Sequence, residues 1–570
     1  MNIKKPADEK ELIQWQWSDF EPGYADLNQQ TLSPANVEAW LKDWTLLCEL
    51  GDELSSRLYV ATSINTVDKD AEQRFNNFME KTFPGISEAD QKLKEKLLAS
   101  SLEPAGFAEP LRRMRAETDV FRMENIPLQV EEQKLNTEHD KVMGAQTVTW
   151  QGEEKTVRFM ETVLRDPNRE TRRQGWELLS TRQLADRQVI NDQWRQFMQL
   201  RLQMAKNAGR PDYRTYRWQQ LSRFAYTPQD CVDFHSAIEK TVGPAVNRLS
   251  ERRKARLGIQ TLRYFDIFVD PSDLPPLAPF KDAAELVRKT SSIFHQVLPE
   301  FGEYFDSLEK NGLLDVPNRK NKASGAYCTS YSFIHSPFIF ANAVGIHDDV
   351  QTLLHEGGHS FHDFKTYPLP YFQQRHAPME FAEVASMGME NLASFFLEES
   401  KGGFYSRQDA ARAILENLET SLRFWPYMAI VDAFQHWVYE NPQKSVDPAN
   451  CDVCWAALED RFRPHLDWSG YEEVKKTGWQ RKDHIHSSPF YYIEYGLAQM
   501  GAVQIWHNAL HDHKSAVRDY RSSLQLGCTV PLPDLFKAAG GKLGFDTATL
   551  GPLVELMEQK MMELDGLVNP

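Results

Sequence analysis

The sequence predicts a mainly α-helical protein with a small β element, and three observations lead to this prediction. Apolar residues recur at a period of about 3.6 residues over many long stretches of the chain. Several of these stretches carry helix start and stop signals, such as a capping residue followed by proline at one end and glycine at the other. Alternating strand patterns are few and short.

Helical signals run through most of the chain. Residues 33–50 have a Ser-Pro start and a glycine after the last residue, so we expect a helix that stops at Gly51. Residues 191–208 have a clear helical period of apolar side chains. Further helices are expected at residues 89–100, 108–124, 166–184, 282–298 and 408–440. Pro426 should break or kink the last of these.

Strand signals occupy three regions. Residues 146–150 alternate in polarity and precede a glycine turn, so they predict a hairpin strand. Residues 264–269 form an aromatic and apolar run that predicts a second strand, followed by a proline-rich, linker-like segment at 270–279. The remaining strand candidates lie within residues 315–345.

Composition limits the classes of function. A chain of 570 residues exceeds the size at which one hydrophobic core keeps growing, so two or more lobes are expected. The net charge is −16 with dispersed acids, which argues against nucleic-acid binding. The mean hydropathy of −0.55 and the lack of a long apolar run argue against a membrane protein. Six cysteines and no leader pattern favour a reducing cytoplasm.

The most informative segment is His355-Glu356-Gly357-Gly358-His359. On a helix, residues four apart lie on one face, so the two histidines can share a tetrahedral Zn²⁺. The glutamate between them is placed to act as general base toward water. Two glycines inside a helix cost roughly 1 kcal/mol each relative to alanine, which indicates close approach of another backbone or of a substrate. The alternative is an exposed helix with two unrelated histidines.

An open zinc site needs a third protein ligand. Lys365 stands where a metzincin has its third histidine, so that class is excluded. A second helical segment follows, in which glutamates are embedded in an apolar run. We expect Glu383 to be the third ligand, with Glu380 as the fallback, and the remaining acids such as Glu390 to orient the histidines. His362 lies on the histidine face and is placed to line the cleft or support a ligand.

The two segments together resemble the thimet oligopeptidase and oligoendopeptidase F family of zinc peptidases. HEGGHSFH and EVASMGME, with 28 positions from His355 to Glu383, fit the family's H-E-x-G-H-x-x-H and E-x-x-S-x-x-x-E. The resemblance implies one Zn²⁺ per chain, held by His355, His359 and Glu383, with Glu356 as general base. It also implies two helical lobes that flank a deep channel, with a small sheet beside the zinc helix.

A C-terminal segment resembles the His/Tyr-rich segment of the oligoendopeptidase F branch, which contacts the scissile carbonyl. Matching its residues implies catalytic roles for His484, Tyr492 and Tyr495, and substrate contacts for His486 and Tyr491. Which of the two histidines faces the zinc stays open. Phenols and imidazolium groups can donate to a developing oxyanion. The alternative is that the tyrosines are core aromatics.

The stretch before the zinc helix, residues 325–351, also resembles that of the family. By analogy, residues 337–343 would form the edge strand to which an extended peptide hydrogen-bonds. An ordinary buried strand is the alternative.

We therefore expect a cytoplasmic zinc oligopeptidase that cleaves internal bonds of short unstructured peptides, with an N-terminal helical lobe at residues 1–200 and a catalytic region at 201–570. One alternative is a dipeptidyl carboxypeptidase-type exopeptidase, in which Arg423 or Arg481 would bind the substrate C-terminus. Another is a non-catalytic peptide-binding protein with a zinc site. Subsite preference, lobe closure and oligomeric state, including a homo-oligomer, stay open.

Overall fold

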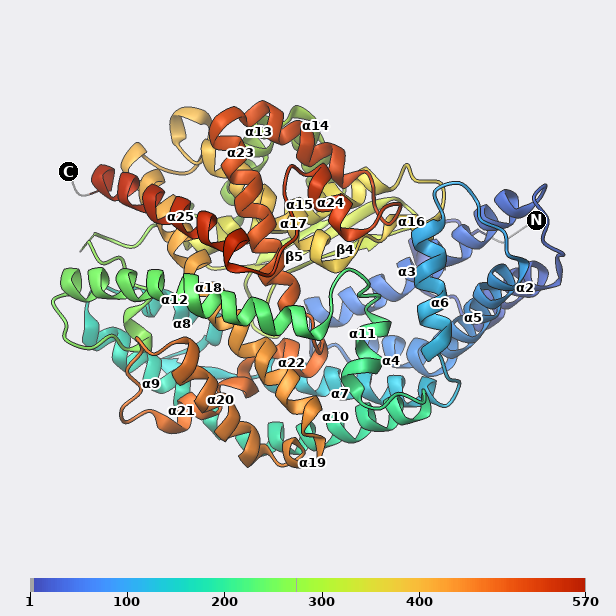
Figure 1. Ribbon diagram of the computed structural model, residues 1–570, viewed down its shortest axis with the longest axis horizontal. Coiled ribbons are helices and arrows are strands. Elements are labelled where there is room, and N and C mark those ends of the chain that lie inside the picture. The colour runs from blue at the N-terminus through green and yellow to red at the C-terminus, as the bar shows by residue number, and fades with distance from the viewer. Residues whose placement is uncertain (1–4, 273, 569–570) are drawn as a thin grey trace.

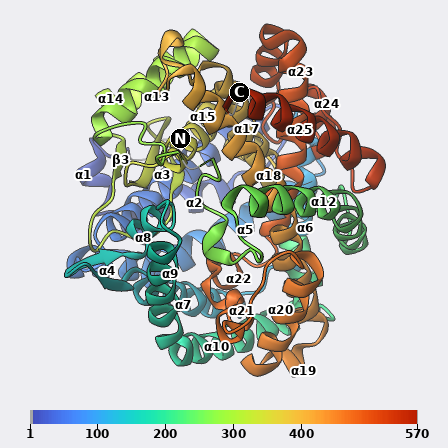
Figure 2. The same cartoon turned by 90° about the vertical axis from the view of Figure 1, so that its left-hand side faces the viewer.

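The computed structural model of the protein describes residues 5–272 and 274–568. It is mainly helical with two small sheets, which confirms the predicted fold class. Figures 1 and 2 show one group of helices above and another below, with the long helices α12 (Pro228–Leu257) and α18 (Arg407–Glu440) between them. Among the described residues, no helix is both long and apolar enough to cross a membrane.

The N-terminal helices gather at the right of Figure 1. They are α1 (Glu9–Leu12), α2 (Trp17–Gln29), α3 (Val37–Ile64), α4 (Lys69–Asn77), α5 (Phe83–Ser100) and α6 (Ala108–Val120). Their buried side chains form a hydrophobic core of their own. The predicted helix stop at Gly51 is wrong. The buried glycine stays inside α3, where side chains such as Ile86 pack on it, so tertiary contacts override its low helix propensity.

The lower group in both views joins segments that are far apart in the sequence. It contains α7 (Asn125–Gly144), α8 (Val157–Val163), α9 (Arg169–Ala185), α10 (Arg187–Asn207), α11 (Tyr213–Gln220), α19 (Pro442–Ser445), α20 (Pro448–Phe462), α21 (Glu472–Lys476) and α22 (Asp483–Ser487). The boundary predicted after residue 200 falls inside α10, whose Trp194 and Met204 belong to the larger core. The division into two parts at that residue stays a prediction.

The upper group carries the two helices with the metal-binding pattern. It contains α13 (Ala283–Val297), α14 (Pro299–Lys310), α15 (His347–Thr366), α16 (Phe372–Arg375), α17 (Met379–Ala393), α23 (Tyr492–Leu524), α24 (Leu532–Ala538) and α25 (Thr547–Val568). Helix α17 packs between α15 and α23, which brings distant motif residues together. The predicted break in α18 is wrong, because this helix runs through Pro426 without interruption.

Two sheets complete the fold. The antiparallel hairpin β1 (Thr147–Trp150) and β2 (Glu153–Thr156) confirms the predicted first strand. The second sheet contains β3 (Leu314–Pro317), β4 (Tyr327–Tyr331) and β5 (Ser336–Ala343) in the order β3-β5-β4. Strand β5 is therefore central, and its residues are almost all buried. The prediction that residues 337–343 form the edge strand is wrong, because β4 occupies that edge.

The strand predicted at residues 264–269 is also wrong. Tyr264–Asp266 form a single 3₁₀ turn. The buried carboxylate of Asp266 accepts hydrogen bonds from the backbone N–H of Arg263 and from the guanidinium of Arg172, at 3.0 Å each. These bonds hold the backbone in a turn, although the aromatic residues around it favour a strand.

Candidate metal centre and active site

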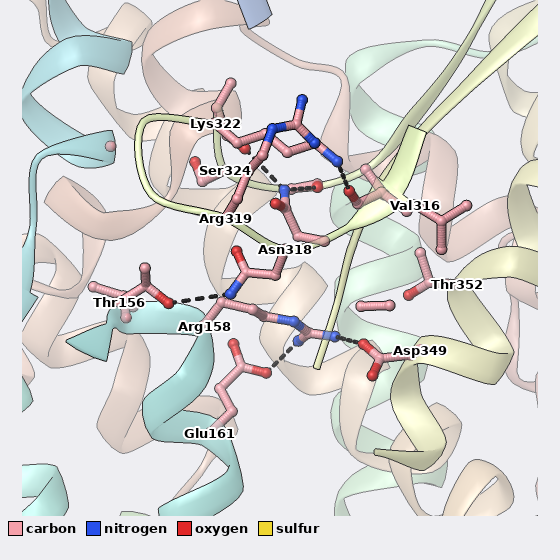
Figure 3. Close-up of a pocket in the computed structure, with 18 of the residues that line it drawn as sticks. Thr156, Arg158, Glu161, Val316, Asn318, Arg319, Lys322, Ser324, Asp349 and Thr352 are labelled. Atoms are coloured by element: carbon pink, nitrogen blue, oxygen red, sulfur yellow. Dashed lines mark hydrogen bonds and ion pairs between the residues drawn. The ribbon is translucent and has the colours of Figure 1, made fainter. Parts of the chain in front are cut away.

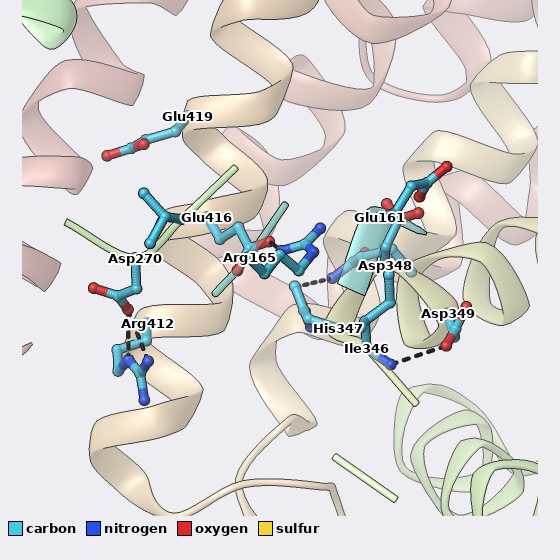
Figure 4. A network of polar contacts seen from close by, with 12 residues as sticks. Glu161, Arg165, Asp270, Ile346, His347, Asp348, Asp349, Arg412, Glu416 and Glu419 are labelled. Carbon is cyan, nitrogen blue, oxygen red and sulfur yellow. Dashed lines mark hydrogen bonds and ion pairs between the residues drawn. The ribbon is translucent and has the colours of Figure 1, made fainter. Parts of the chain in front are cut away.

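The first turn of α15 is capped by Asp349. Its Oδ2 accepts hydrogen bonds from the backbone N–H groups of Val344, Gly345 and Ile346, at 2.8, 2.7 and 3.0 Å. Its other oxygen pairs with Arg158 of α8 at 3.0 Å. Figure 4 shows the bond between Asp349 and Ile346 beside a cluster of further ion pairs. These contacts fix where the helix begins and tie it to α8.

The two glycines of the motif permit close packing next to the histidines. A Cβ on Gly357 would lie 2.3 Å from the ring of Phe294. A Cβ on Gly358 would lie 2.6 Å from the backbone of Ala385 and of Ser386 on α17. Both distances are far below van der Waals contact. The expected close approach of a second backbone is therefore confirmed at Gly358.

His355, His359 and Glu383 converge from α15 and α17, with one ligand atom of each within 4.8 Å of the others. Oε2 of Glu383 lies 3.4 Å from Nε2 of His355 and 3.6 Å from Nε2 of His359. Two imidazole nitrogens and one carboxylate oxygen are the donor set of catalytic zinc sites, which keep a fourth position open. The residues present therefore fit a zinc ion.

Hydrogen bonds orient these three side chains. Nδ1 of His355 donates to Oε1 of Glu390 at 2.7 Å, which leaves a lone pair on Nε2 for a metal. Oε2 of Glu383 accepts from the hydroxyl of Ser386 at 3.1 Å, and Oε1 accepts from Tyr491 at 2.5 Å. Burial opposes the ionisation of Glu383, yet the charges of His359 and His355 and hydrogen bonds from His355 and Tyr491 hold its pKa at about 2. The carboxylate is thus ready to bind a cation.

Glu356 stands beside this group with a free acceptor. Its side chain is buried, and its Oε2 has no hydrogen-bond partner among the described residues. Burial raises the pKa of Glu356 to about 7, and the nearby carboxylates of Glu383 and Glu390 act in the same direction. A carboxylate in this environment can accept a proton near neutral pH.

The structure places the other acidic and histidine candidates of this region elsewhere. Oε1 of Glu380 accepts from the hydroxyl of Tyr226 at 2.6 Å and lies 3.7 Å from Nε of Arg223. Glu380 therefore neither joins the metal-binding group nor orients its histidines. His362 is buried with its ring against Phe381, and burial lowers its pKa to about 3.

The C-terminal segment contributes His484, Tyr491 and Tyr495. All three line a cavity of about 1030 Å³. Nε2 of His484 and the hydroxyl of Tyr495 are hydrogen-bonded at 3.2 Å, and the rings of Tyr491 and Tyr495 lie 5.2 Å apart. Since Tyr491 lines the cavity and also donates to Glu383, it links the metal-binding group to the cavity. Burial raises the pKa of Tyr495 well above its ordinary value, so its hydroxyl stays protonated.

Two candidates of this segment point away from the cavity. His486 is fully buried, and its ring stacks on His139 at 4.3 Å and meets Trp194 edge-on. His484, and not His486, therefore lines the cavity. The predicted contact of His486 with a substrate is wrong, because its ring is buried against His139 and Trp194. Tyr492 packs against the rings of Phe424 and Tyr427 in the core. Its assignment as a donor is corrected as well.

The cavity lies between the N-terminal helices and the C-terminal half. Helices α3, α4, α5 and α7 contribute one wall, through side chains such as Tyr59, Phe75 and Glu132. The opposite wall comes from the start of β4, with Tyr327, and from α22 and α23. Of the cations proposed for a substrate C-terminus, Arg481 lines this cavity and Arg423 lines a separate small one.

A smaller cavity of about 270 Å³ adjoins the large one, and both are lined by residues 323–326. Figure 3 shows Arg158, Arg319 and Lys322 around it, with Asp349 bonded to Arg158. The loop before β4 therefore lies between the two cavities.

Sequence reasoning missed the contacts that support this site from afar. Arg201 of α10 donates to the carbonyl oxygen of Ile485 at 3.2 Å and also to that of His486. Arg223 donates to the carbonyl oxygen of Phe490 at 2.5 Å and to Glu494 at 2.6 Å. No local pattern marks these arginines, because their partners lie far away in the sequence.

Known proteins match this chain over long stretches. An Oligoendopeptidase F homolog of Lactococcus lactis subsp. lactis is 26% identical over 341 residues, which cover 57% of this chain and 53% of the relative. Oligopeptidase PepF of Bacillus subtilis is 25% identical over 362 residues, which cover 59% of this chain and 49% of that relative. The chain thus spans about half the length of the curated relatives it matches.

The structure matches a solved protein over its whole length. The structure described as PZ peptidase A with inhibitor 2 superposes with a TM-score of 0.90 and 25% identity, over 100% of this chain and 99% of that chain. Residues 162–552, well over half of the chain, match the model of peptidase family M3. The two motifs that carry the metal-binding group lie inside this range. The chain belongs to peptidase family M3.

Proposed function

We propose that this protein is a zinc-dependent oligopeptidase that hydrolyses internal bonds of short, unstructured peptides. One observation carries the proposal: His355, His359 and Glu383 form a zinc donor set beside the buried, unpartnered carboxylate of Glu356. The family membership and the relatives support it. A protein that only binds peptides would need no such carboxylate beside the metal ligands.

Each part of the site has a separate task in hydrolysis. A Zn²⁺ ion held by His355, His359 and Glu383 would supply a Lewis acid that lowers the pKa of water towards neutrality. Glu356 accepts the proton of the attacking water and passes it to the leaving amine. At the cavity side, the hydroxyl of Tyr495 donates a hydrogen bond to the carbonyl oxygen as charge develops on it. Burial lowers the pKa of His484 to about 4, so this neutral ring donates from Nε2 to the Tyr495 hydroxyl and orients it. Glu390 accepts a hydrogen bond from Nδ1 of His355 and so holds the orientation of its ring.

The walls of the cavity support a restriction to extended peptides. Its volume of about 1030 Å³ holds a short peptide but no folded domain. Strand β4 is one of the two edges of the sheet, since β5 is paired on both sides. An extended substrate can add to this edge as a further strand, with Tyr327 at its start.

The exopeptidase alternative rests on Arg481, which lines the same cavity. This side chain already donates a hydrogen bond to the carbonyl oxygen of Val474 at 2.9 Å. Binding a substrate carboxylate would compete with this bond. Digestion of a mixed peptide library, read by mass spectrometry, distinguishes the two modes. We expect cleavage at internal bonds, unaffected by amidation of the substrate C-terminus. Uniform release of C-terminal dipeptides that amidation abolishes would instead establish the exopeptidase.

The replacement Tyr495→Phe tests the donor role. It removes one hydroxyl at the cavity and keeps the ring. We expect kcat to fall by about 100-fold while KM changes little, because the bond forms with the developing oxyanion. Tyr492→Phe is the matched control, since Tyr492 is buried among core aromatics. Equal kinetics for the two variants would show that Tyr495 is not a donor.

A further inference from the structure

A second group of metal-ligand side chains lies in the core between α12 and α18. Cys231 and His235 are four residues apart on α12, and Asp432 and His436 are four residues apart on α18. The two helices pack against each other, so the pairs face across their interface. One ligand atom each of Cys231, Asp432 and His436 lies within 4.8 Å of the others.

This cluster is fully enclosed by protein. Cys231 and Asp432 are 0% exposed, and His436 is 4% exposed. Oδ1 of Asp432 has no hydrogen-bond partner among the described residues, whereas Nε2 of His436 lies 3.3 Å from Oδ2 of the same carboxylate. Buried polar atoms in folded proteins nearly always have a partner, and an ion is one of the standard explanations for an exception. The unpartnered oxygen of Asp432 thus points to a ligand between the helices.

One oxygen of Asp432 is free to bind a metal, whereas His436 must move its proton from Nε2 to Nδ1 to do so. Nε2 of His235 donates to Oδ2 of Asp432 at 2.8 Å, which fixes the carboxylate and keeps Oδ1 available. Nη1 of Arg214 lies 3.3 Å from Nδ1 of His436, and the same guanidinium pairs with Glu440. Ligation through Nε2 puts the proton of the imidazole on Nδ1, so Arg214 would then turn to Glu440 alone.

We propose that Cys231, Asp432 and His436 bind a second Zn²⁺, distinct from the one at His355. A thiolate, a carboxylate and an imidazole suit zinc and do not suit calcium or magnesium, which prefer oxygen ligands alone. Binding releases the thiol proton of Cys231 to solvent, and no electron transfer is involved.

The position of this site indicates a structural task. The ring of His436 lies 5.3 Å from that of Phe490, and the neighbouring Gln435 accepts a hydrogen bond from the backbone N–H of Phe490 at 2.6 Å. Phe490 directly precedes Tyr491, which bonds to Glu383. A metal between α12 and α18 therefore helps to hold Phe490, and with it the neighbouring Tyr491, in position.

The number of zinc ions bound per chain tests the proposal. Zinc per chain is measured by mass spectrometry of the metal in wild-type protein, in Cys231→Ser and in a His355→Ala/His359→Ala double variant. We expect two ions in the wild type and one in each variant. The double variant loses the proposed catalytic zinc, so its remaining ion reports on the second site alone. A wild type with one ion and a double variant with none would overturn the proposal.

Cobalt provides an independent readout, because the site at His355 has no sulfur ligand. Co²⁺ bound by a thiolate shows charge-transfer absorption in the near ultraviolet. We expect this band in the wild type and in the double variant, and its loss in Cys231→Ser. Cys528→Ser, which alters another buried free cysteine, is the matched control and should keep it. If Cys231→Ser does not fold, absence of the band in the well-folded double variant still overturns the proposal.

Discussion

Replacing Glu356 by glutamine is expected to lower kcat for peptide hydrolysis by about 100-fold to 10,000-fold, the range that a general base contributes. The amide keeps the size of the side chain but cannot accept a proton from water. The change touches none of the ligands His355, His359 and Glu383. We therefore expect the metal content to equal that of the wild type.

Steady-state hydrolysis of a fluorogenic peptide and metal analysis of the same sample test this expectation. Glu309→Gln on α14 is the matched control, since Glu309 is exposed and remote from the site. It should retain full activity. Turnover by Glu356→Gln at the wild-type rate would exclude Glu356 as the base, whatever the metal content.

Gly358→Ala is expected to reduce both stability and metal affinity. The added methyl group would lie 2.6 Å from the backbone oxygen of Ala385 and from Cα of Ser386. Backbone atoms of a buried helix cannot move aside easily, so α15 and α17 must separate. Overpacking of this kind costs about 1–3 kcal/mol in the free energy of unfolding. Separation of the helices also carries Glu383 away from the two histidines.

Gly551→Ala on α25 is the control for this substitution. A Cβ there meets no atom within 4 Å, so only the helix propensity changes, in favour of alanine by roughly 1 kcal/mol. Denaturant unfolding of both variants, with zinc titration of the Gly358 variant, measures the two effects. An unfolding free energy equal to that of the wild type would show that the interface between α15 and α17 is not tightly packed.

The sequence was informative wherever spacing along one helix determines geometry. His355 and His359 are four residues apart on α15, so their convergence follows from helix geometry alone. The two motif glycines likewise signalled a close neighbour, which the structure identifies as Phe294 at one glycine and α17 at the other. The apolar helical run around Glu383 also pointed to this residue as the third ligand, but helix periodicity does not predict how α15 and α17 pack to bring it to the histidines.

The sequence was less informative where tertiary packing decides. Tyr491 and Tyr495 share the cavity face as an i, i+4 pair, whereas Tyr492 turns into the core, and helix periodicity alone does not tell which face is which. The aromatic run at 264–269 has strand-like composition, but the buried carboxylate of Asp266 holds a turn there. The order of the strands could not be predicted from the sequence either, since β5 is central only because β3 pairs with it in parallel.

The burial of His486 has a consequence for how this enzyme fold can be divided. Its ring rests on His139 and Trp194, and the carbonyl oxygen of the same residue accepts from Arg201. Helix α22, which carries His486, is thus held by residues from the first part of the chain, while the metal-ligand candidates come from the later part. A fragment that begins near residue 200 would keep His484, Tyr491 and Tyr495 but lose His139 and Trp194, on which His486 rests. A truncated form of this protein must therefore keep both parts to preserve the position of α22.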